Sequence, residues 1–108
     1  RILTRVISRP THETLTLDLG YKACASDPAL SKRLAFPSLT DSEVILQNEE
    51  HLVLQTPDAH RYQPGDTLLA IPGHVCPTSA LHKEALVIDD GYIVDTWPVS
   101  ARDRWLTV

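Results

Sequence analysis

Hydrophobic and polar residues alternate along several segments of the chain. In residues 14–19 leucines occupy every second position, and threonine or aspartate occupies the positions between them. Because successive side chains of a strand point to opposite faces, this alternation predicts a half-buried β-strand that ends at Gly20. Residues 2–8, ILTRVIS, alternate less regularly and predict a second strand. We find no long segment with helical periodicity.

Two pairs of apolar runs predict β-hairpins. The runs at residues 44–46 and 52–54 flank the polar tip QNEE. The second hairpin is predicted for residues 84–97, where Asp90-Gly91 supplies a two-residue turn. Such a turn needs positive φ angles, which glycine adopts without steric cost.

The remaining segments complete an all-β pattern. Residues 26–38 contain two prolines and predict a loop with one helical turn after Asp27. Residues 60–66, HRYQPGD, predict a turn that leads into a strand at 67–72. Short strands at this regular spacing are typical of an antiparallel β-barrel or sandwich. We therefore expect a single, mainly antiparallel β-domain over residues 1–108, with short helical turns.

Composition and charge exclude several classes of partner. The chain is 43% hydrophobic and 22% charged, with a net charge of −4. Its basic residues are scattered and outnumbered, which argues against nucleic acid as a partner. The apolar runs are shorter than the roughly 18 residues that a membrane helix needs, and no secretory signal is visible. We expect a cytoplasmic protein without a membrane partner.

The spacing of the two cysteines indicates their redox state. Cys24 and Cys76 lie far apart in the sequence and form no disulfide framework, which favours reduced thiols. A redox protein with a Cys24–Cys76 bridge is the alternative.

The chain has no methionine and opens directly on the strand-like residues 2–8. This predicts a piece of a longer protein, with another domain before Arg1.

The segment PGHVCPT places His74 and Cys76 two positions apart. In an extended backbone these side chains would point to the same side and could bind one ion, with Zn–N near ~2.0 Å and Zn–S near ~2.3 Å. Pro72 and Pro77 would stiffen the backbone beside them. Two ligands are too few for a structural zinc site, but an open site could take water and substrate. The alternative is a loop histidine beside an ordinary cysteine.

Two further clusters contain charged residues. In residues 18–27, DLGYKACASD, a desolvated Lys22 would be an amine nucleophile, but a solvated surface lysine is the interpretation we favour. In WPVSARDRW, Arg102 and Arg104 flank Asp103. An arginine fork suits a carboxylate or phosphate, but we favour a structural ion pair.

Along the chain, TLDLGYKACASD is followed by GDTLLAIPGHVCPT and then by DGYIVDTWPVSARDR. Together, in this order, these segments resemble the C-terminal β-domain of the D-threonine aldolase and D-serine dehydratase family. These are pyridoxal-phosphate enzymes of the alanine-racemase-like class. The resemblance runs from about Val6 to Arg104. The first motif of the family is usually Asp-Ala-Gly-x-Lys-Ala, and here Leu19 replaces its first alanine. The other residues of that motif are present: Asp18, Gly20, Lys22 and Ala23.

The resemblance implies a two-domain parent enzyme. An upstream β/α barrel would carry pyridoxal phosphate on its own lysine, so Lys22 is not that lysine. His74 and Cys76 match the family's metal ligands. The thiolate favours zinc, whereas manganese is typical of relatives with aspartate in place of the cysteine. Because these enzymes pair head to tail as homodimers, the resemblance also makes Asp18 and Lys22 candidate active-site lining residues.

The resemblance thus predicts the metal-carrying C-terminal domain of a lyase that acts on small D-3-hydroxy amino acids, as an aldolase or a dehydratase. Its partner would be its own N-terminal barrel. We assign no catalytic residue within this chain and expect it to be inactive alone. The alternative is a free-standing β-barrel binding module without metal or catalysis.

Overall fold

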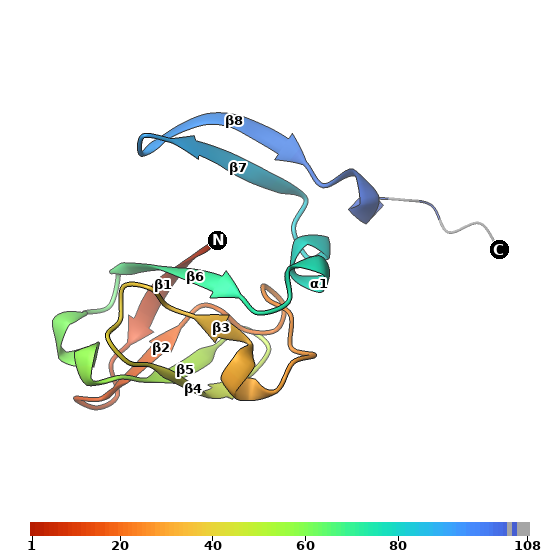
Figure 1. The fold of residues 1–108 in the computed structure, drawn as a ribbon. Helices are drawn as coiled ribbons and strands as arrows, with labels where there is room; N and C mark the ends of the chain where they lie inside the picture. The colour runs from red at the N-terminus through yellow and green to blue at the C-terminus, as the bar shows by residue number, and fades with distance from the viewer. Residues whose placement is uncertain (104, 106–108) are drawn as a thin grey trace.

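Six short strands form one antiparallel sheet that curls into a nearly closed barrel (Figure 1). The computed structural model describes residues 1–103 and 105. Along the sheet the strand order is β3-β6-β1-β2-β5-β4. The strands are β1 (Ile2–Ser8), β2 (Thr14–Leu17), β3 (Leu34–Ala35), β4 (Glu43–Gln47), β5 (Leu52–Gln55) and β6 (Thr67–Pro72).

Alternating leucines form the centre of the barrel core. On β2 and β5, Leu15 is paired with Leu54 and Leu17 with Leu52, and all four side chains are fully buried. The threonines between the leucines of β2 are half-exposed. The strand predicted from the alternation, and the hairpin that joins β4 to β5, are therefore confirmed.

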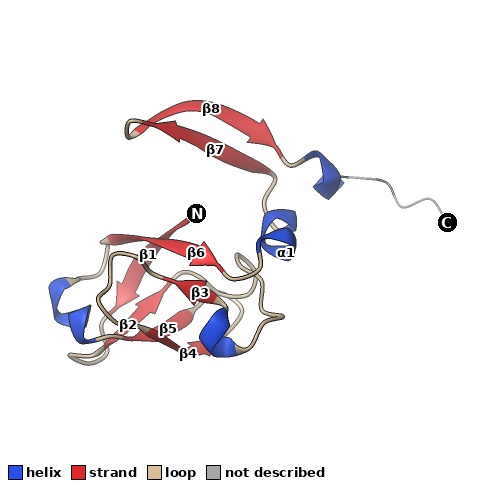
Figure 2. Ribbon diagram, in the orientation of Figure 1, coloured by secondary structure: helices blue, strands red, loops and turns tan. Residues whose placement is uncertain are grey.

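Short helical turns connect the strands, and one more follows the last strand (Figure 2). They are η1 (Leu30–Lys32), η2 (Pro57–Arg61), α1 (Val75–Ala80) and η3 (Ser100–Asp103). The turn predicted after Asp27 is confirmed as η1, and so is the all-β fold class with short helical turns. None of the helices within residues 1–103 and 105 is long and apolar enough to cross a membrane.

Three of these turns, η2, α1 and η3, were not predicted. In η2 the side chain of Thr56 accepts a hydrogen bond from the backbone N–H of Asp58 at 3.2 Å, and Pro57 begins the helix. Threonine followed by proline is a common start of a helical turn, so the sequence did contain this signal. Helix α1 has only six residues, too few for an apolar periodicity to appear.

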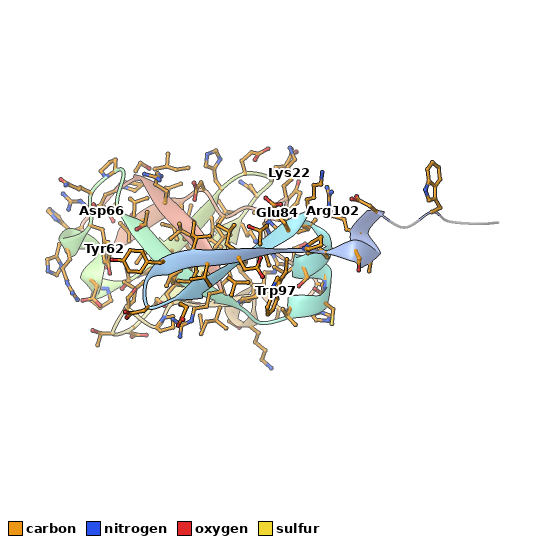
Figure 3. All side chains as sticks on the ribbon, turned by 90° about the horizontal axis from the view of Figure 1, so that it is seen from above. Lys22, Tyr62, Asp66, Glu84, Trp97 and Arg102 are labelled. Atoms are coloured by element: carbon orange, nitrogen blue, oxygen red, sulfur yellow. The ribbon has the colours of Figure 1, made fainter. Side chains whose placement is uncertain are left out.

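The predicted C-terminal hairpin is confirmed as β7 (Glu84–Asp89) and β8 (Tyr92–Pro98). Its turn residues Asp90 and Gly91 have φ angles of 46° and 80°, as the two-residue turn requires. The hairpin forms its own two-stranded sheet and lies above the barrel (Figure 1), along its length when seen from above (Figure 3). Apart from the half-buried Val87, its side chains are exposed.

The ion pair predicted after this hairpin is present in part. Arg102 Nη1 lies 3.5 Å from Asp103 Oδ1 in η3. Arg104 lies outside the described residues.

The barrel core generates a prediction for stability. Replacing the buried Leu54 by alanine should lower the free energy of unfolding by about 2–5 kcal/mol, because it removes packed methyl groups and leaves a cavity. Ile45 on the neighbouring strand is 42% exposed, so Ile45→Ala should cost about 1 kcal/mol or less. Urea denaturation followed by circular dichroism measures both. Equal losses in the two variants would contradict this assignment of the core.

Candidate functional site

The candidate site begins where β6 leaves the sheet. Residue Gly73 follows directly and donates its backbone N–H to the carbonyl oxygen of Arg33 at 2.8 Å. A Cβ atom at position 73 would lie only 1.9 Å from the carbonyl oxygen of Lys32. Any side chain larger than that of glycine at position 73 would therefore displace the backbone of Lys32. The hydrogen bond to Arg33 fixes the point at which the segment with His74 and Cys76 leaves the sheet.

The backbone after Gly73 is not extended as predicted. His74 still has extended angles, φ −130° and ψ 103°, but it is the N-cap of α1, and Cys76 lies in the first helical turn. Proline is tolerated in that turn, so Pro77 does not prevent the helix. The expectation that His74 and Cys76 share one face of a strand is therefore wrong. Both residues project from the same short turn at the end of β6.

The His74 ring is held by Asp27. Its Nδ1 atom lies 2.6 Å from Asp27 Oδ2, and the two side chains are 46% and 54% exposed. Because an ionised carboxylate only accepts hydrogen bonds, Nδ1 is the donor. In the neutral ring, Nε2 then carries the free lone pair that a metal ion needs. Asp27 ends the cluster DLGYKACASD, so two of the three sequence clusters meet here.

The buried Thr78 connects α1 to the loop that carries Asp27 through hydrogen bonds. The hydroxyl of Thr78 donates to the carbonyl oxygen of His74 at 2.7 Å and accepts from the backbone N–H of Ala25 at 3.0 Å. The Cys24 sulfur lies 3.8 Å from the same hydroxyl. Thr78 therefore fixes the backbone on both sides of the contact between Asp27 and His74.

A second histidine strengthens the same connection. His82 Nε2 donates to the carbonyl oxygen of Ala23 at 2.8 Å. The sequence spacing of His82 does not suggest a metal ligand. Its contact with Ala23 forms only because the loop after β2 lies beside the end of α1. The roles of Asp27 and Thr78 were missed for the same reason, because no spacing in the sequence pairs them with His74.

The two cysteines have different surroundings. Cys24 is buried and Cys76 is exposed, and both are free thiols. Burial raises the pKa of Cys24, an effect that the hydrogen bond with Thr78 opposes. The bridge that the redox alternative requires is therefore not formed in this structure. Cys76 is the thiol that a dissolved ion can reach.

Lys22 is a paired surface residue. Its Nζ atom lies 2.7 Å from Glu50 Oε1 and 3.0 Å from Glu49 Oε2, and the side chain is exposed. Hydrogen bonds with these glutamates raise the pKa of Lys22. An amine nucleophile needs the opposite shift. The solvated lysine favoured from the sequence agrees with this environment.

Asp18 is fixed at the end of β2. Its Oδ1 accepts hydrogen bonds from the Thr4 hydroxyl at 2.7 Å and from the backbone N–H of Arg5 at 2.6 Å. The carboxylate thus attaches β2 to β1. The predicted place of Asp18 and Lys22 in the lining of an active site remains a prediction.

The donor atoms fit an open metal site better than a closed one. Within residues 1–103 and 105, no three His, Cys, Asp or Glu side chains form a group that could hold an ion. His74 and Cys76 would supply one nitrogen and one sulfur, a combination that suits zinc. The other positions would belong to water or substrate, as the sequence predicted.

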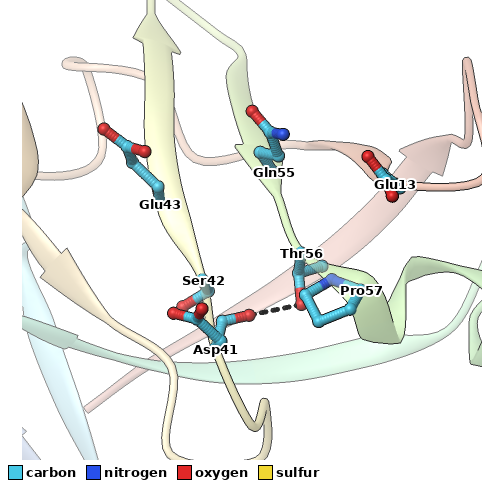
Figure 4. A pocket seen from close by; sticks show the side chains of 7 residues that line it. All are labelled: Glu13, Asp41, Ser42, Glu43, Gln55, Thr56 and Pro57. Atoms are coloured by element: carbon cyan, nitrogen blue, oxygen red, sulfur yellow. Dashed lines mark hydrogen bonds between the residues drawn. The ribbon is translucent and has the colours of Figure 1, made fainter.

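A separate hollow lies near η2, at the other end of the barrel from α1 (Figures 1 and 4). Between two of its lining residues, the hydroxyl of Thr56 donates to the backbone carbonyl of Asp41 at 2.6 Å. It contains none of the residues discussed above as candidate ligands. Its lining residues are Glu13, Asp41, Ser42, Glu43, Gln55, Thr56 and Pro57.

Comparison with known proteins defines the family. The model of the putative serine dehydratase domain matches residues 1–88. The chain belongs to this family. Its fold resembles that of D-threonine aldolase from Filomicrobium marinum, with a TM-score of 0.81 and 25% identity over 93% of this chain and 27% of that one. D-threo-3-hydroxyaspartate dehydratase from Delftia sp. HT23 shares the fold, with a TM-score of 0.71 and 21% identity.

Curated relatives differ in length. A D-threonine aldolase of an Arthrobacter species is 33% identical over 102 residues, which cover 94% of this chain and 26% of the relative. The chain thus spans about a quarter of that aldolase. An uncharacterized protein of Mycobacterium tuberculosis is 32% identical over 108 residues, which cover 95% of this chain and 80% of the relative.

The position of Thr78 generates a stability prediction. Thr78→Val keeps the shape but removes the hydroxyl, so the N–H of Ala25 loses its partner and the carbonyl of His74 loses one hydrogen bond. The free energy of unfolding should fall by about 1–3 kcal/mol, the cost of unpaired buried polar groups. Thr78→Ser keeps the hydroxyl and should recover most of that loss. Urea denaturation compares the three proteins, and equal stability of the valine variant would contradict the role of Thr78.

The two thiols should react at different rates. Cys76 is accessible, whereas burial both shields Cys24 and raises its pKa, which leaves less thiolate at a given pH. Near neutral pH a chromogenic disulfide reagent should therefore modify one thiol rapidly. Cys76→Ser should remove the fast phase and Cys24→Ser should keep it. Two thiols of equal rate in the folded protein would contradict this difference.

Proposed function

We propose that this chain is the metal-carrying C-terminal domain of a pyridoxal-phosphate-dependent lyase that acts on small D-3-hydroxy amino acids. The observation that carries the proposal is the pair at the end of β6. His74 has its Nδ1 engaged by Asp27 and its Nε2 left for a metal, and Cys76 two residues later is an exposed thiol. In a chain of the putative serine dehydratase domain family, these are donors for an open divalent-metal site.

Two structural relatives support the pair. Both are variants of D-threo-3-hydroxyaspartate dehydratase, with TM-scores of 0.72 and 0.70 to this chain. In one a histidine is replaced by alanine; in the other a cysteine two positions further on is replaced by alanine, and that protein is described as metal-free. The spacing of the two replaced residues equals that of His74 and Cys76.

The chain's own residues would hold the ion and leave its remaining positions open. His74 would donate through Nε2 and Cys76 through its thiolate. The soft sulfur ligand favours zinc over manganese. A bound divalent ion supplies Lewis acidity to the substrate's β-hydroxyl, for its departure in a dehydratase or for its deprotonation in an aldolase. A reducing, cytoplasmic environment would keep Cys76 available as a ligand.

The proposal includes a domain arrangement. Residues 1–108 would form one domain that follows a barrel, and that barrel would provide the lysine for pyridoxal phosphate, the electron sink of the reaction. The chain alone would be inactive for lack of that lysine. In a head-to-tail homodimer, Asp18 and Lys22 would line the active site of the partner subunit.

One observation favours a second candidate function. The mycobacterial relative is only slightly longer than this chain, which covers 80% of it. A free-standing β-barrel binding module, without metal or catalysis, would match such a length. The gene decides between the two arrangements: a barrel sequence with its lysine directly upstream of Arg1 fits the lyase, and its absence fits the module.

The metal assignment predicts the behaviour of three alanine variants. His74→Ala and Cys76→Ala should each weaken zinc binding to the chain by about tenfold or more, since each removes one of only two protein ligands. His12→Ala removes an exposed histidine from the loop before β2 and should bind zinc as the unmodified chain does. Competition with a chromogenic zinc chelator measures all four affinities.

The full-length protein provides the test of activity. Loaded with pyridoxal phosphate and zinc, it should release pyruvate or aldehyde from D-3-hydroxy amino acids. A chelator, His74→Ala or Cys76→Ala should abolish this release, and the chain alone should show none. Undiminished turnover after complete metal removal would reject the metal role. Zinc binding that is unchanged in both ligand variants would reject the pair itself.

A further inference from the structure

We propose that Asp27 is the positioning residue of the metal ligand His74. Its carboxylate would hold the imidazole in the Nδ1–H tautomer and direct Nε2 toward the ion. This inference rests on the proposed function, because it assigns Asp27 a role toward the same metal. It adds a residue to the site that stands 47 positions from its partner in the sequence.

The contact has the length and chemistry of a strong hydrogen bond. The 2.6 Å between Asp27 Oδ2 and His74 Nδ1 is shorter than an ordinary neutral N–H···O bond. A carboxylate cannot donate, so the proton lies on Nδ1 and the ring presents Nε2 outward. Histidines that bind metals commonly donate their other N–H to a carboxylate in this way, which fixes the ring plane and makes the ligand nitrogen more basic.

An exposed hydrogen bond between a histidine and a carboxylate is by itself weak evidence for a role, because such surface pairs contribute little to stability. Here, however, the backbone on both sides is fixed. Ala25, two residues before Asp27, donates its N–H to Thr78, and Thr78 in turn binds the carbonyl of His74. Pro28 follows Asp27 and disfavours helical backbone angles at Asp27, which reduces the freedom of the loop. The carboxylate therefore approaches the ring from an ordered loop.

Asp27 is better placed to orient the ligand than to be one. The Oδ2 atom of Asp27 is already engaged by His74 Nδ1. Asp27, His74 and Cys76 do not form a three-residue group that could hold an ion within residues 1–103 and 105. The carboxylate would act on the metal through the His74 ring. Its effect can therefore be measured as a change in the His74 tautomer and as a change in zinc affinity.

The test compares Asp27→Ala and Asp27→Asn with the unmodified chain and with Asp89→Asn, a matched control in the exposed hairpin. Zinc affinity is measured by chelator competition, and the His74 tautomer by nitrogen NMR of histidine-labelled protein without metal. Asp27→Ala should bind zinc about 10- to 100-fold more weakly and should lose the Nδ1–H preference of His74. Asp27→Asn keeps an acceptor oxygen and should fall between Asp27→Ala and the unmodified chain. Asp89→Asn should change neither quantity.

Urea denaturation of the same variants separates this role from simple folding support, since removal of an exposed pair should leave stability nearly unchanged. Unchanged zinc affinity in both Asp27 variants, with His74→Ala still losing zinc, overturns the inference alone. An unchanged tautomer in Asp27→Ala also overturns it. If His74→Ala binds zinc as tightly as the unmodified chain, the proposed metal site fails, and the inference fails with it.

Discussion

The hydroxyl of Thr78 accepts from the backbone of the loop after β2 and donates to the backbone of the residue that caps α1. Both elements of the candidate site depend on this buried group. On one side it orders the loop that carries Asp27, and on the other it holds the turn that carries His74. Gly73, which the close approach of Lys32 requires, fixes the same turn to the edge of the sheet. The barrel thus positions a site whose side chains are themselves exposed.

Local pattern was enough to predict most of the strands, in the barrel and in the C-terminal hairpin. The alternating leucines of β2, the apolar runs around QNEE and the turn at Asp90-Gly91 each specify a strand or hairpin within a few residues. Such signals are local because side chains alternate along a strand and turns need particular residues. Helix α1 has no comparable signal, since its six residues include a proline and are held by contacts with a distant loop.

Only part of the candidate site could be predicted from the sequence. The spacing of His74 and Cys76, together with the order of the three clusters, predicted the pair as candidate ligands, although the backbone between them was wrongly expected to be extended. The partner of His74 could not be identified in this way. Asp27 contacts the His74 ring only because the barrel closes and the loop that carries Asp27 packs on α1. The spacing of residues along the chain predicts neither of these contacts. Tertiary structure alone supplies that contact.

The hairpin of β7 and β8 carries apolar side chains that are more than half exposed: Leu86, Ile88, Tyr92, Ile93 and Trp97. Within the described residues each of its strands pairs only with the other, so both outer edges keep free backbone groups. An edge of this kind is a template for another strand, and apolar faces add to the attraction. Association of copies through this hairpin would therefore increase with concentration, and it would not require the barrel core to open.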